Sequence, residues 1–345
     1  MQNAGSGYLE KFSNNESRAL ISILNWNGAE KTIECLNSLQ KHHPNLNEYA
    51  TINVIDNGSS AHDASAVEDY CKINKIEYKR NTVNLGFAGG HNTTLQKSLT
   101  ENYLCSILIN NDCIFIENTI TPLMEALKAD INVGAASPQL AYEDSKEIYF
   151  SGAYQNWNTL SSIWSPKPNN NDFWTTNKKT IWAVGTVWAL RCTAIQKVGL
   201  LDDELFAYCE DDDYGERLIR AGFRTTIIPN PVVLHGNQPK TEELRPPYFY
   251  YLTTRNHVRF YLKYTPKSHR KLLHLRLLLQ YEHRSHLIKI KGGSRESHAV
   301  KSGYQDAISN HFGHPRPDNK LMIKFILLFQ LAKLINTLHH IVKQK

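Results

Sequence analysis

Apolar residues follow two different spacings along the first part of the chain. Short apolar runs, typical of buried strands, lie at residues 19–24, 51–56 and 103–109. Between the first two runs, Ile33, Leu36 and Leu39 recur at helical spacing within residues 29–40. This alternation predicts an α/β fold, in which a mostly parallel sheet is covered by helices on both faces.

The second part of the chain changes texture twice. Residues 154–179 are rich in Asn, Trp and Pro without a helical period, which predicts a long loop or extended hairpin over a functional site. Strand character returns at 180–191 and 222–236, and from about residue 247 the sequence is basic and helical. We therefore expect a polar tail at 1–18, an α/β domain at 19–246 and a helical C-terminal region at 247–345.

The composition narrows the class of protein. With 41% hydrophobic and 21% charged residues, the 345-residue chain resembles an ordinary soluble globular protein. Its six cysteines are scattered without a CxxC pair, and the N-terminal stretch lacks the apolar core of a signal peptide. We therefore expect free thiols and a cytoplasmic location.

Positive charge is concentrated near the C-terminus. The chain carries a net charge of +6, yet residues 255–301 alone hold twelve Lys or Arg and two acids. The rest of the chain is therefore slightly acidic. This distribution predicts a basic patch that faces an anionic surface.

Polar residues follow the predicted strands at the edge of the sheet where ligands usually bind. Asn25, Asp56 and Asp112 each come after an apolar strand. Asp56 suits a base N–H as acceptor, although a turn cap is the commoner use of such an Asp. Asp112, preceded by Asn110 and Asn111, offers oxygens for Mg²⁺ or Mn²⁺ on a diphosphate, or forms a simple turn; both interpretations are open.

A glycine-rich stretch, "NLGFAGGHN" at 84–92, predicts a loop before a helix near 92–100. Its glycines at 86, 89 and 90 permit close approach of the backbone to a phosphate or a sugar. The spacing is not the dinucleotide-binding GxGxxG. On its own, the loop is weak evidence for a ligand.

Taken in order, six stretches within residues 18–260 resemble the family-2 glycosyltransferases. They are "ISILNWNG", "VIDNGS", "NLGFAGGHN", "LINND", "VGLLDDELFAYCEDDDYGERLIRAGF" and "PNPVVLHG". The resemblance is to the subgroup that adds rhamnose, galactofuranose and related sugars to bacterial surface polysaccharides. It implies a GT-A fold and an inverting hexosyltransferase. Such an enzyme would move a sugar from a dTDP- or UDP-sugar to a hydroxyl of a glycan or lipid-linked glycan.

The resemblance also implies a donor site. Its nucleotide-sugar-binding residues would be Asn25, Asp56, Asn84, Gly86, Gly90, Asn110 and Asn111, and its metal ligands Asp112 and His235. Asn110 stands where the family's DXD motif has its first acid, so the site loses one negative charge and we expect weaker metal binding. The imidazole of His235 favours Mn²⁺ over Mg²⁺, although a plain turn histidine is the alternative.

Four acids in a row, Glu210 to Asp213, have two explanations. Acids suit the first turn of a helix, where free N–H groups and the dipole favour negative charge. The resemblance instead makes Asp211 the general base and gives Glu210, Trp182 and Gly185 contacts to the acceptor or sugar. We expect both to hold, with the helix start aiming Asp211, and Asp213 pairing with Arg217 four residues on.

The C-terminal residues 321–343 are largely apolar, but polar side chains interrupt them. No uninterrupted apolar run among them is long enough to span a membrane. One helical stripe collects Ile323, Leu327, Leu331, Leu334, Leu338 and Ile341. Two interpretations are open. The stripe lies on the anionic inner face of the cytoplasmic membrane, or it packs against the catalytic domain or a second subunit.

Two other functions compete with glycosyl transfer. A sugar-1-phosphate nucleotidyltransferase would need a basic glycine-rich signature after the first strand, and "NWNGAEKT" lacks one. A non-catalytic protein that binds carbohydrate or nucleic acid has no need for Asp112, Asp211 and His235 together. We therefore expect no nucleic-acid partner.

Overall fold

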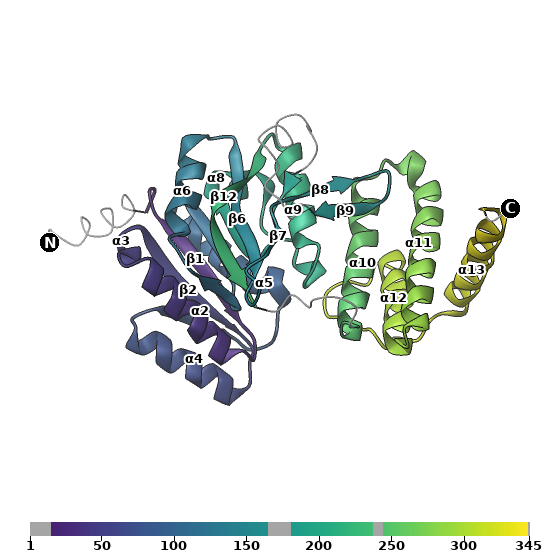
Figure 1. Ribbon diagram of the computed structural model, residues 1–345, viewed down its shortest axis with the longest axis horizontal. Coiled ribbons are helices and arrows are strands. Elements are labelled where there is room, and N and C mark those ends of the chain that lie inside the picture. The colour runs from purple at the N-terminus through teal and green to yellow at the C-terminus, as the bar shows by residue number, and fades with distance from the viewer. Residues whose placement is uncertain (1–14, 165–180, 237–243, 344–345) are drawn as a thin grey trace, which may run out of the picture. The chain divides into compact units, whose positions relative to one another are not determined.

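The computed structural model describes residues 15–164, 181–236 and 244–343, and the chain divides into two compact units (Figure 1). The first unit comprises Met1–Asp203 and Glu210–Gln238, and the second comprises Glu204–Cys209 and Pro239–Lys345. The short segment 204–209 thus belongs to the second unit although the chain on both sides of it belongs to the first.

The first unit is an α/β unit in which strands and helices alternate, as the sequence predicts. Its strands are β1 (Ala19–Asn25), β2 (Ala50–Asn57), β3 (Glu77–Asn81), β4 (Cys105–Asn110), β5 (Cys113–Phe115), β6 (Val133–Tyr142), β7 (Ile148–Phe150), β8 (Ala153–Asn156), β9 (Ser161–Trp164), β10 (Ile181–Trp182), β11 (Val187–Arg191) and β12 (Arg224–His235). Its helices are α2 (Ala29–His42), α3 (Leu46–Tyr49), α4 (Ala61–Ile73), α5 (Gly86–Thr100), α6 (Ile120–Ala129), α8 (Cys192–Val198) and α9 (Glu210–Arg220).

The main sheet is mixed. Its strand order is β3-β2-β1-β4-β11-β6-β12-β5, with β7 paired to β6. The neighbours from β3 to β4 are all parallel, but β11 runs antiparallel to both β4 and β6. An apolar run indicates that a segment is a buried strand but does not indicate the direction in which the strand runs. The predicted sheet is therefore more parallel than the observed one.

Helices cover both faces of this sheet, as predicted. Successive residues of β1 point to opposite faces, so Ile21 and Ile23 enter one core and Leu20 enters the other. Helices α2, α4 and α6 pack into the first core, and α5, α8 and α9 pack into the second. Most of the strand residues in these two cores are fully buried. Their packing holds the polar residues at the strand ends in fixed positions.

The expected hairpin in the middle region is present in part. Strands β8, β9 and β10 form a small separate antiparallel sheet. The remainder of the region, including Trp174, lies outside the described residues.

The glycine-rich stretch is helical, which corrects the predicted loop. Helix α5 begins at Gly86, six residues before the expected start near 92. Gly90 lies on this helix where a Cβ atom would be 2.5 Å from Cδ1 of Leu24. The glycine therefore lets α5 pack closely on β1, and this packing outweighs the low helix propensity of glycine.

The second unit is helical. Its elements after residue 243 are α10 (Pro247–Tyr264), the 3₁₀ turn η2 (Lys267–His269), α11 (Arg270–Ile290), α12 (Ser294–Ile308) and α13 (Ile323–Lys343), and the 3₁₀ turn η1 (Asp203–Leu205) lies where the chain enters it. Helices α10 and α12 pack closely at Gly303, where a Cβ atom would be 2.4 Å from the carbonyl oxygen of Tyr251. Arg255, the first residue of the basic segment, is fully buried in this unit.

The C-terminal helix packs through a different face from the predicted stripe. Phe325, Phe329 and Ala332 are buried, with both phenylalanine rings against Tyr304 of α12. The stripe is exposed instead: Ile323, Leu327, Leu331 and Leu334 are 53–76% accessible to solvent. The side chains of Leu338 and Ile341 lie outside the described residues. Among the helices that the structure describes, none combines the length and apolarity needed to cross a membrane.

Candidate active site

Asn25 and Asp56 lie side by side at the ends of β1 and β2. They are register partners of the parallel pair, and Nδ2 of Asn25 donates to Oδ2 of Asp56 at 2.9 Å. The same amide donates to Oδ1 of Asp63 at 2.8 Å, and Oδ1 of Asn25 accepts from the hydroxyl of Thr32 at 2.7 Å. Both residues are fully buried. The sequence predicts this pair, whereas Asp63 was missed because its helical position carries no signal of its own.

Asp56 also makes the turn contact that the alternative interpretation expects. Its Oδ1 accepts from the backbone N–H of Ser59 at 3.1 Å and lies 3.4 Å from Nε of Arg80. This carboxylate therefore fixes the turn after β2. Its contact with a nucleoside stays a prediction.

Asn84 fixes the start of α5. Its Oδ1 accepts from the backbone N–H of Gly86 at 2.7 Å and from Nδ2 of Asn57 at 3.0 Å. Asn57 further donates to the carbonyl of Gly86 and accepts from the N–H of Leu85. Asn57, which sequence reasoning did not single out, therefore ties β2 to the first turn of the glycine-rich helix.

Asp112 and His235 come together at the edge of the sheet. Nε2 of His235, the last residue of β12, lies 3.0 Å from Oδ1 of Asp112, in the turn between β4 and β5. Strands β12 and β5 pair antiparallel, which brings His235 opposite Cys113. The hydroxyl of Tyr149 on β7 lies 2.8 Å from Nδ1 of His235. The ring thus has one nitrogen held by Tyr149 and the other directed at a carboxylate.

The electrostatics of this pair favour a charged carboxylate. Burial raises the pKa of Asp112, but the hydrogen bond and charge of His235, helped by Lys31, outweigh it and leave the pKa below its ordinary value. An ionised oxygen beside an imidazole nitrogen is a donor set that suits Mn²⁺. Tyr149 was missed because an aromatic residue in a short strand carries no sign of a polar role.

The two residues before Asp112 make different contacts. The backbone N–H of Asn110 donates to the carbonyl of Thr186 at 2.8 Å. The side chain of Asn111 donates to the hydroxyl of Thr32 at 3.0 Å, so it is directed at the start of α2. Asn111 therefore supports the turn from the helix side.

The four acids form the first turn of α9, as predicted, and all four are buried. Oδ2 of Asp211 accepts from the backbone N–H of Gly185 at 3.3 Å, and its Oδ1 accepts from the N–H of Asp212 at 3.0 Å. Asp212 accepts from the hydroxyl of Ser162 on β9 at 2.7 Å. The Gly185 contact ties Asp211 to one of the residues predicted beside the sugar.

The neighbouring carboxyls are hard to ionise together. Burial raises the pKa of Asp211 to about 6, although hydrogen bonds from backbone N–H groups oppose the shift. Burial, and then the charge of Asp211, raises the pKa of Asp212 well above its ordinary value. A carboxylate with a pKa near neutrality is suited to accept a proton.

The remaining acids of α9 form ion pairs along the helix. Oδ2 of Asp213 lies 2.9 Å from Nε of Arg217, which confirms the predicted pair four residues apart. Glu216 pairs in the same way with Arg220 at 2.8 Å. The guanidinium of Arg217 also donates to the carbonyls of Val198 and Leu200. Asp213 is therefore a structural acid, whereas Glu210 and the next two residues begin the helix.

Trp182 and Gly185 are packed against the elements that carry the other candidates. Trp182 is buried, and a Cβ atom on Gly215 of α9 would lie 2.6 Å from the Cβ of this tryptophan. A Cβ atom on Gly185 would lie 2.9 Å from Cζ of Phe87 on α5. Small residues at these two positions therefore let α9 and α5 approach the segment from Trp182 to Gly185.

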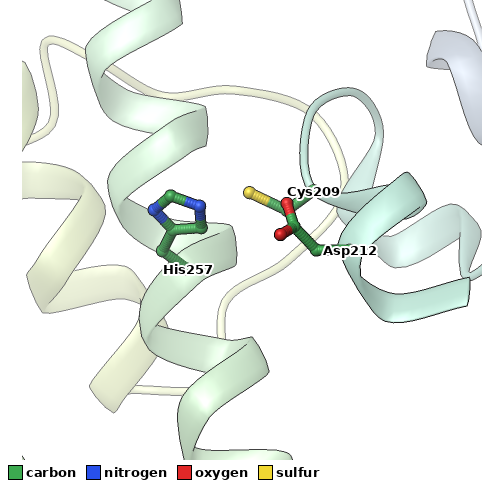
Figure 2. Close-up of side chains that lie close together, drawn as sticks. All are labelled: Cys209, Asp212 and His257. Carbon is green, nitrogen blue, oxygen red and sulfur yellow. The ribbon is translucent and has the colours of Figure 1, made fainter. Parts of the chain in front are cut away.

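A thiol and an imidazole meet in the second unit. Figure 2 shows Cys209 and His257 of this unit, whose ligand atoms lie within 4.8 Å of each other. Burial, and then the charge of Arg284, lowers the pKa of His257 to about 4, so its imidazole is neutral. Sulfur and imidazole suit Zn²⁺, whereas a hard divalent cation prefers the oxygen of Asp112.

Comparison with known proteins agrees with this architecture. The profile of "Glycosyl transferase family 2" matches residues 21–199, more than half of the chain. A 60-residue stretch is 37% identical to the N-acetylglucosaminyl-diphospho-decaprenol L-rhamnosyltransferase of Mycobacterium tuberculosis. That stretch covers 17% of this chain and 20% of the length of that relative.

Solved glycosyltransferases share the fold at low identity. GalNAc-T7 with UDP, GalNAc and Mn²⁺ superposes with a TM-score of 0.57 at 20% identity, covering 71% of this chain and 48% of that one. S. aureus TarS 1–349 superposes with a TM-score of 0.52 at 15% identity, covering 84% and 81%. The mannosyltransferase PcManGT from Pyrobaculum calidifontis in complex with GDP-Man and Mn²⁺ gives 0.50 at 15% identity, covering 92% and 80%.

The profile match and the fold neighbours agree with each other: the profile identifies the family, and the neighbours share its fold. The predicted resemblance to the family, including its rhamnosyltransferase-like members, is confirmed. The chain belongs to glycosyl transferase family 2, and its α/β unit has the GT-A fold.

Proposed function

We propose that this enzyme transfers a sugar, with inversion, from a dTDP- or UDP-sugar to a hydroxyl of a glycan or lipid-linked glycan in the synthesis of a bacterial surface polysaccharide. The name of the partial relative supports rhamnose as the first sugar to test. UDP in one fold neighbour supports a nucleotide-diphosphate donor.

The observation that carries the proposal is the environment of Asp211. This carboxylate is buried in the first turn of α9, accepts a hydrogen bond from Gly185 and has its pKa raised to about 6. An acid used only to begin a helix is normally solvated and has no need of such a pKa. A base that takes a proton from a hydroxyl near neutral pH does have that need.

In the proposed reaction, the oxygen of the acceptor hydroxyl forms a bond with the anomeric carbon of the donor. The bond from that carbon to the diphosphate oxygen breaks on the opposite face, and the diphosphate leaves with the electron pair. The hydroxyl proton passes to a carboxylate oxygen of Asp211. Glu210 is proposed to contact the acceptor, and Trp182 and Gly185 are proposed to lie beside the sugar.

Donor binding is assigned to the strand ends. Asn25, Asp56, Asn84, Gly86, Gly90, Asn110 and Asn111 are proposed to form or support the nucleotide-sugar site. Because Asn25 and Asp56 are fully buried and bonded to each other, their proposed role is to hold the turn after β2 against the nucleoside. Mn²⁺ in two fold neighbours supports use of a divalent cation.

Asp112 and His235 would hold Mn²⁺ or Mg²⁺. The fit rests on Tyr149. When Nδ1 of His235 carries the proton, its N–H donates a hydrogen bond to the tyrosine oxygen, and Nε2 keeps its lone pair beside Asp112. When bound, such a cation would neutralise charge that develops on the diphosphate.

Attachment to the inner face of the cytoplasmic membrane is the second part of the proposal. The exposed leucines of α13 belong to the same unit as exposed basic residues of α11, such as Lys271 and Arg276. Apolar side chains beside positive charge are complementary to an anionic bilayer surface. A lipid-linked acceptor would then be within reach of the enzyme.

The experiment that tests the function is a donor screen. Release of nucleotide diphosphate is measured with UDP-, dTDP- and GDP-sugars, a rhamnose donor included, in the presence of MnCl₂ and a membrane extract as the source of acceptor. We expect release with a dTDP- or UDP-sugar that depends on the extract. Production of a nucleotide sugar from a sugar 1-phosphate would instead favour a nucleotidyltransferase.

A further inference from the structure

The segment that leads into α9 is held by two buried side chains of α10. We call residues 204–209 the entry segment. Nδ2 of Asn256 lies within 2.8–2.9 Å of the carbonyl oxygens of Leu205, Ala207 and Tyr208. Nη2 of Arg255 donates to the carbonyl of Leu205 at 2.9 Å. Both Arg255 and Asn256 are fully buried and, like the entry segment, belong to the second unit.

The entry segment has an unusual backbone. Phe206, Tyr208 and Cys209 have φ values of 65°, 70° and 68°, in the left-handed region that side chains other than glycine rarely adopt. Such residues persist where the surrounding structure determines them fully. Each carbonyl that Asn256 binds belongs to the residue immediately before one of these three positions. The amide of Asn256 therefore helps to hold the unusual backbone in place.

Arg255 sets the orientation of Asn256. Nε of Arg255 donates to Oδ1 of Asn256 at 2.9 Å, so the NH₂ group of the asparagine turns toward the entry segment. Nη1 of the same guanidinium donates to the carbonyl of Gly313 at 2.7 Å. The fork therefore joins three parts of the second unit: α10, the entry segment and the turn at residue 313.

We propose that Arg255 and Asn256 are positioning residues for glycosyl transfer. By holding the carbonyls of the entry segment, they fix the direction in which the chain continues from Cys209 into Glu210 and thus the position of Asp211. The proposal rests on the proposed role of Asp211. Because a displacement of about 1 Å can cost about 10²-fold in rate, loss of these hydrogen bonds acts on kcat without contact to either substrate.

The test combines hydrogen exchange with kinetics on the full-length chain. In Asn256→Ala we expect faster amide exchange in peptides covering 205–213, and kcat lower by roughly 10²-fold. The dissociation constant of UDP or dTDP with MnCl₂, whichever nucleotide the donor screen identifies, should stay unchanged, because the proposed donor site lies at the strand ends. All rates are taken well below the melting temperature of each variant, so that loss of folded protein does not contribute.

The matched control is Thr254→Val, which changes a neighbouring residue of α10 that is equally buried and nearly the same size. It should leave both exchange and kcat near the wild-type values. If Asn256→Ala fails to fold, Arg255→Lys takes its place. This variant keeps the positive charge but loses the forked guanidinium, and we expect a lower kcat with unchanged nucleotide binding.

Two results would overturn the proposal: a kcat within twofold of wild type in a variant whose melting temperature falls, or unchanged exchange across 205–213. Asp211→Asn is measured in parallel. If that variant keeps its kcat, the proposed function fails. If it is inactive while the Asn256 variant is fully active, only the role of the entry segment fails.

Discussion

At the residue scale, a substitution of Asp211 distinguishes a catalytic role from a role in helix capping. Asp211→Asn keeps the size of the side chain and its ability to accept the hydrogen bond from Gly185. If the acid only begins α9, the change costs little activity. Because Asn cannot accept the hydroxyl proton, we expect kcat to fall about 10²–10⁴-fold, with the dissociation constant of the nucleotide diphosphate unchanged. Steady-state release assays and calorimetry measure the two quantities.

The control for this substitution is Glu216→Gln, on the same helix. Glu216 is also buried, but its partner is the half-exposed Arg220, so the variant should keep its rate. Asp211→Asn also removes a charge that burial disfavours. Its free energy of unfolding should therefore equal or exceed that of wild type above pH 6, and any gain should vanish below about pH 4, where the carboxyl is protonated in both states. If Asp211→Asn and Glu216→Gln have equal kcat values, Asp211 has no catalytic role and only begins the helix.

The pH dependence of the rate belongs to the pair Asp211 and Asp212. The base must be ionised, so kcat should fall as the pH drops through about 6, the raised pKa of Asp211. Burial and the charge of Asp211 raise the pKa of Asp212 well above its ordinary value, so Asp212 keeps its proton while Asp211 titrates. Asp212→Asn should therefore leave this acidic limb in place. The amide can still accept from Ser162. A wild-type pH–rate profile without an acidic limb near pH 6, or a limb that moves when Asp212 is replaced, contradicts the assignment.

At the scale of elements, sequence patterns predict which segments are strands or helices better than they predict the direction in which a strand runs. The apolar runs of β1, β2 and β4 predict buried strands, and Ile33, Leu36 and Leu39 predict α2 correctly. The antiparallel course of β11 follows from its pairing with β4 and β6, which no local pattern encodes. Likewise, α5 begins at Gly86 because its packing against Leu24 is tertiary, so the glycine content alone favours a loop.

The candidate site shows the same division. The ends of predicted strands place Asn25 beside Asp56, because parallel strands end at one edge of a sheet. The meeting of Asp112 with His235 required the resemblance to the family, since the two are more than a hundred residues apart. Tyr149 and Ser162 escaped prediction because each acts through a contact with a distant element, β12 or α9.

The contact between β7 and β12 gives a prediction about metal binding. Tyr149→Phe removes the hydroxyl that holds His235, and we expect the affinity of UDP-bound enzyme for Mn²⁺ to fall by about 10- to 100-fold. Asp112→Ala should abolish Mn²⁺-dependent nucleotide binding. Titration calorimetry with MnCl₂ and UDP, or with dTDP if that is the donor nucleotide, measures both. Tyr70→Phe, on the surface helix α4, serves as the control and should bind normally. Full activity in excess EDTA would refute a role for metal.

At the scale of the whole chain, the second unit includes a short segment, residues 204–209, that the sequence does not mark. The acids from Glu210 onward and the entry segment before them read as one continuous motif, yet they belong to different units. Buried Arg255 and Asn256 hold the entry segment. Arg255 counts toward the basic segment in the sequence but contributes nothing to its surface. Net charge along a chain therefore overstates the charge that a partner meets.

The last prediction concerns the exposed stripe of α13. Because α13 packs through Phe325, Phe329 and Ala332, the leucines at 327, 331 and 334 can change to Ser without opening the core. We expect this triple variant to lose co-sedimentation with vesicles containing phosphatidylglycerol and to keep sugar transfer to a soluble acceptor. Vesicles of phosphatidylcholine alone should bind wild type weakly, and added salt should weaken binding to the anionic vesicles, because the basic side chains of α11 contribute through charge. Gln330→Ser, an exposed change on the same helix, is the control and should bind as wild type does. If the triple variant still binds the vesicles, the stripe does not contact lipid. If wild type instead elutes as a dimer and the triple variant as a monomer in size-exclusion chromatography, the stripe joins two copies of the chain.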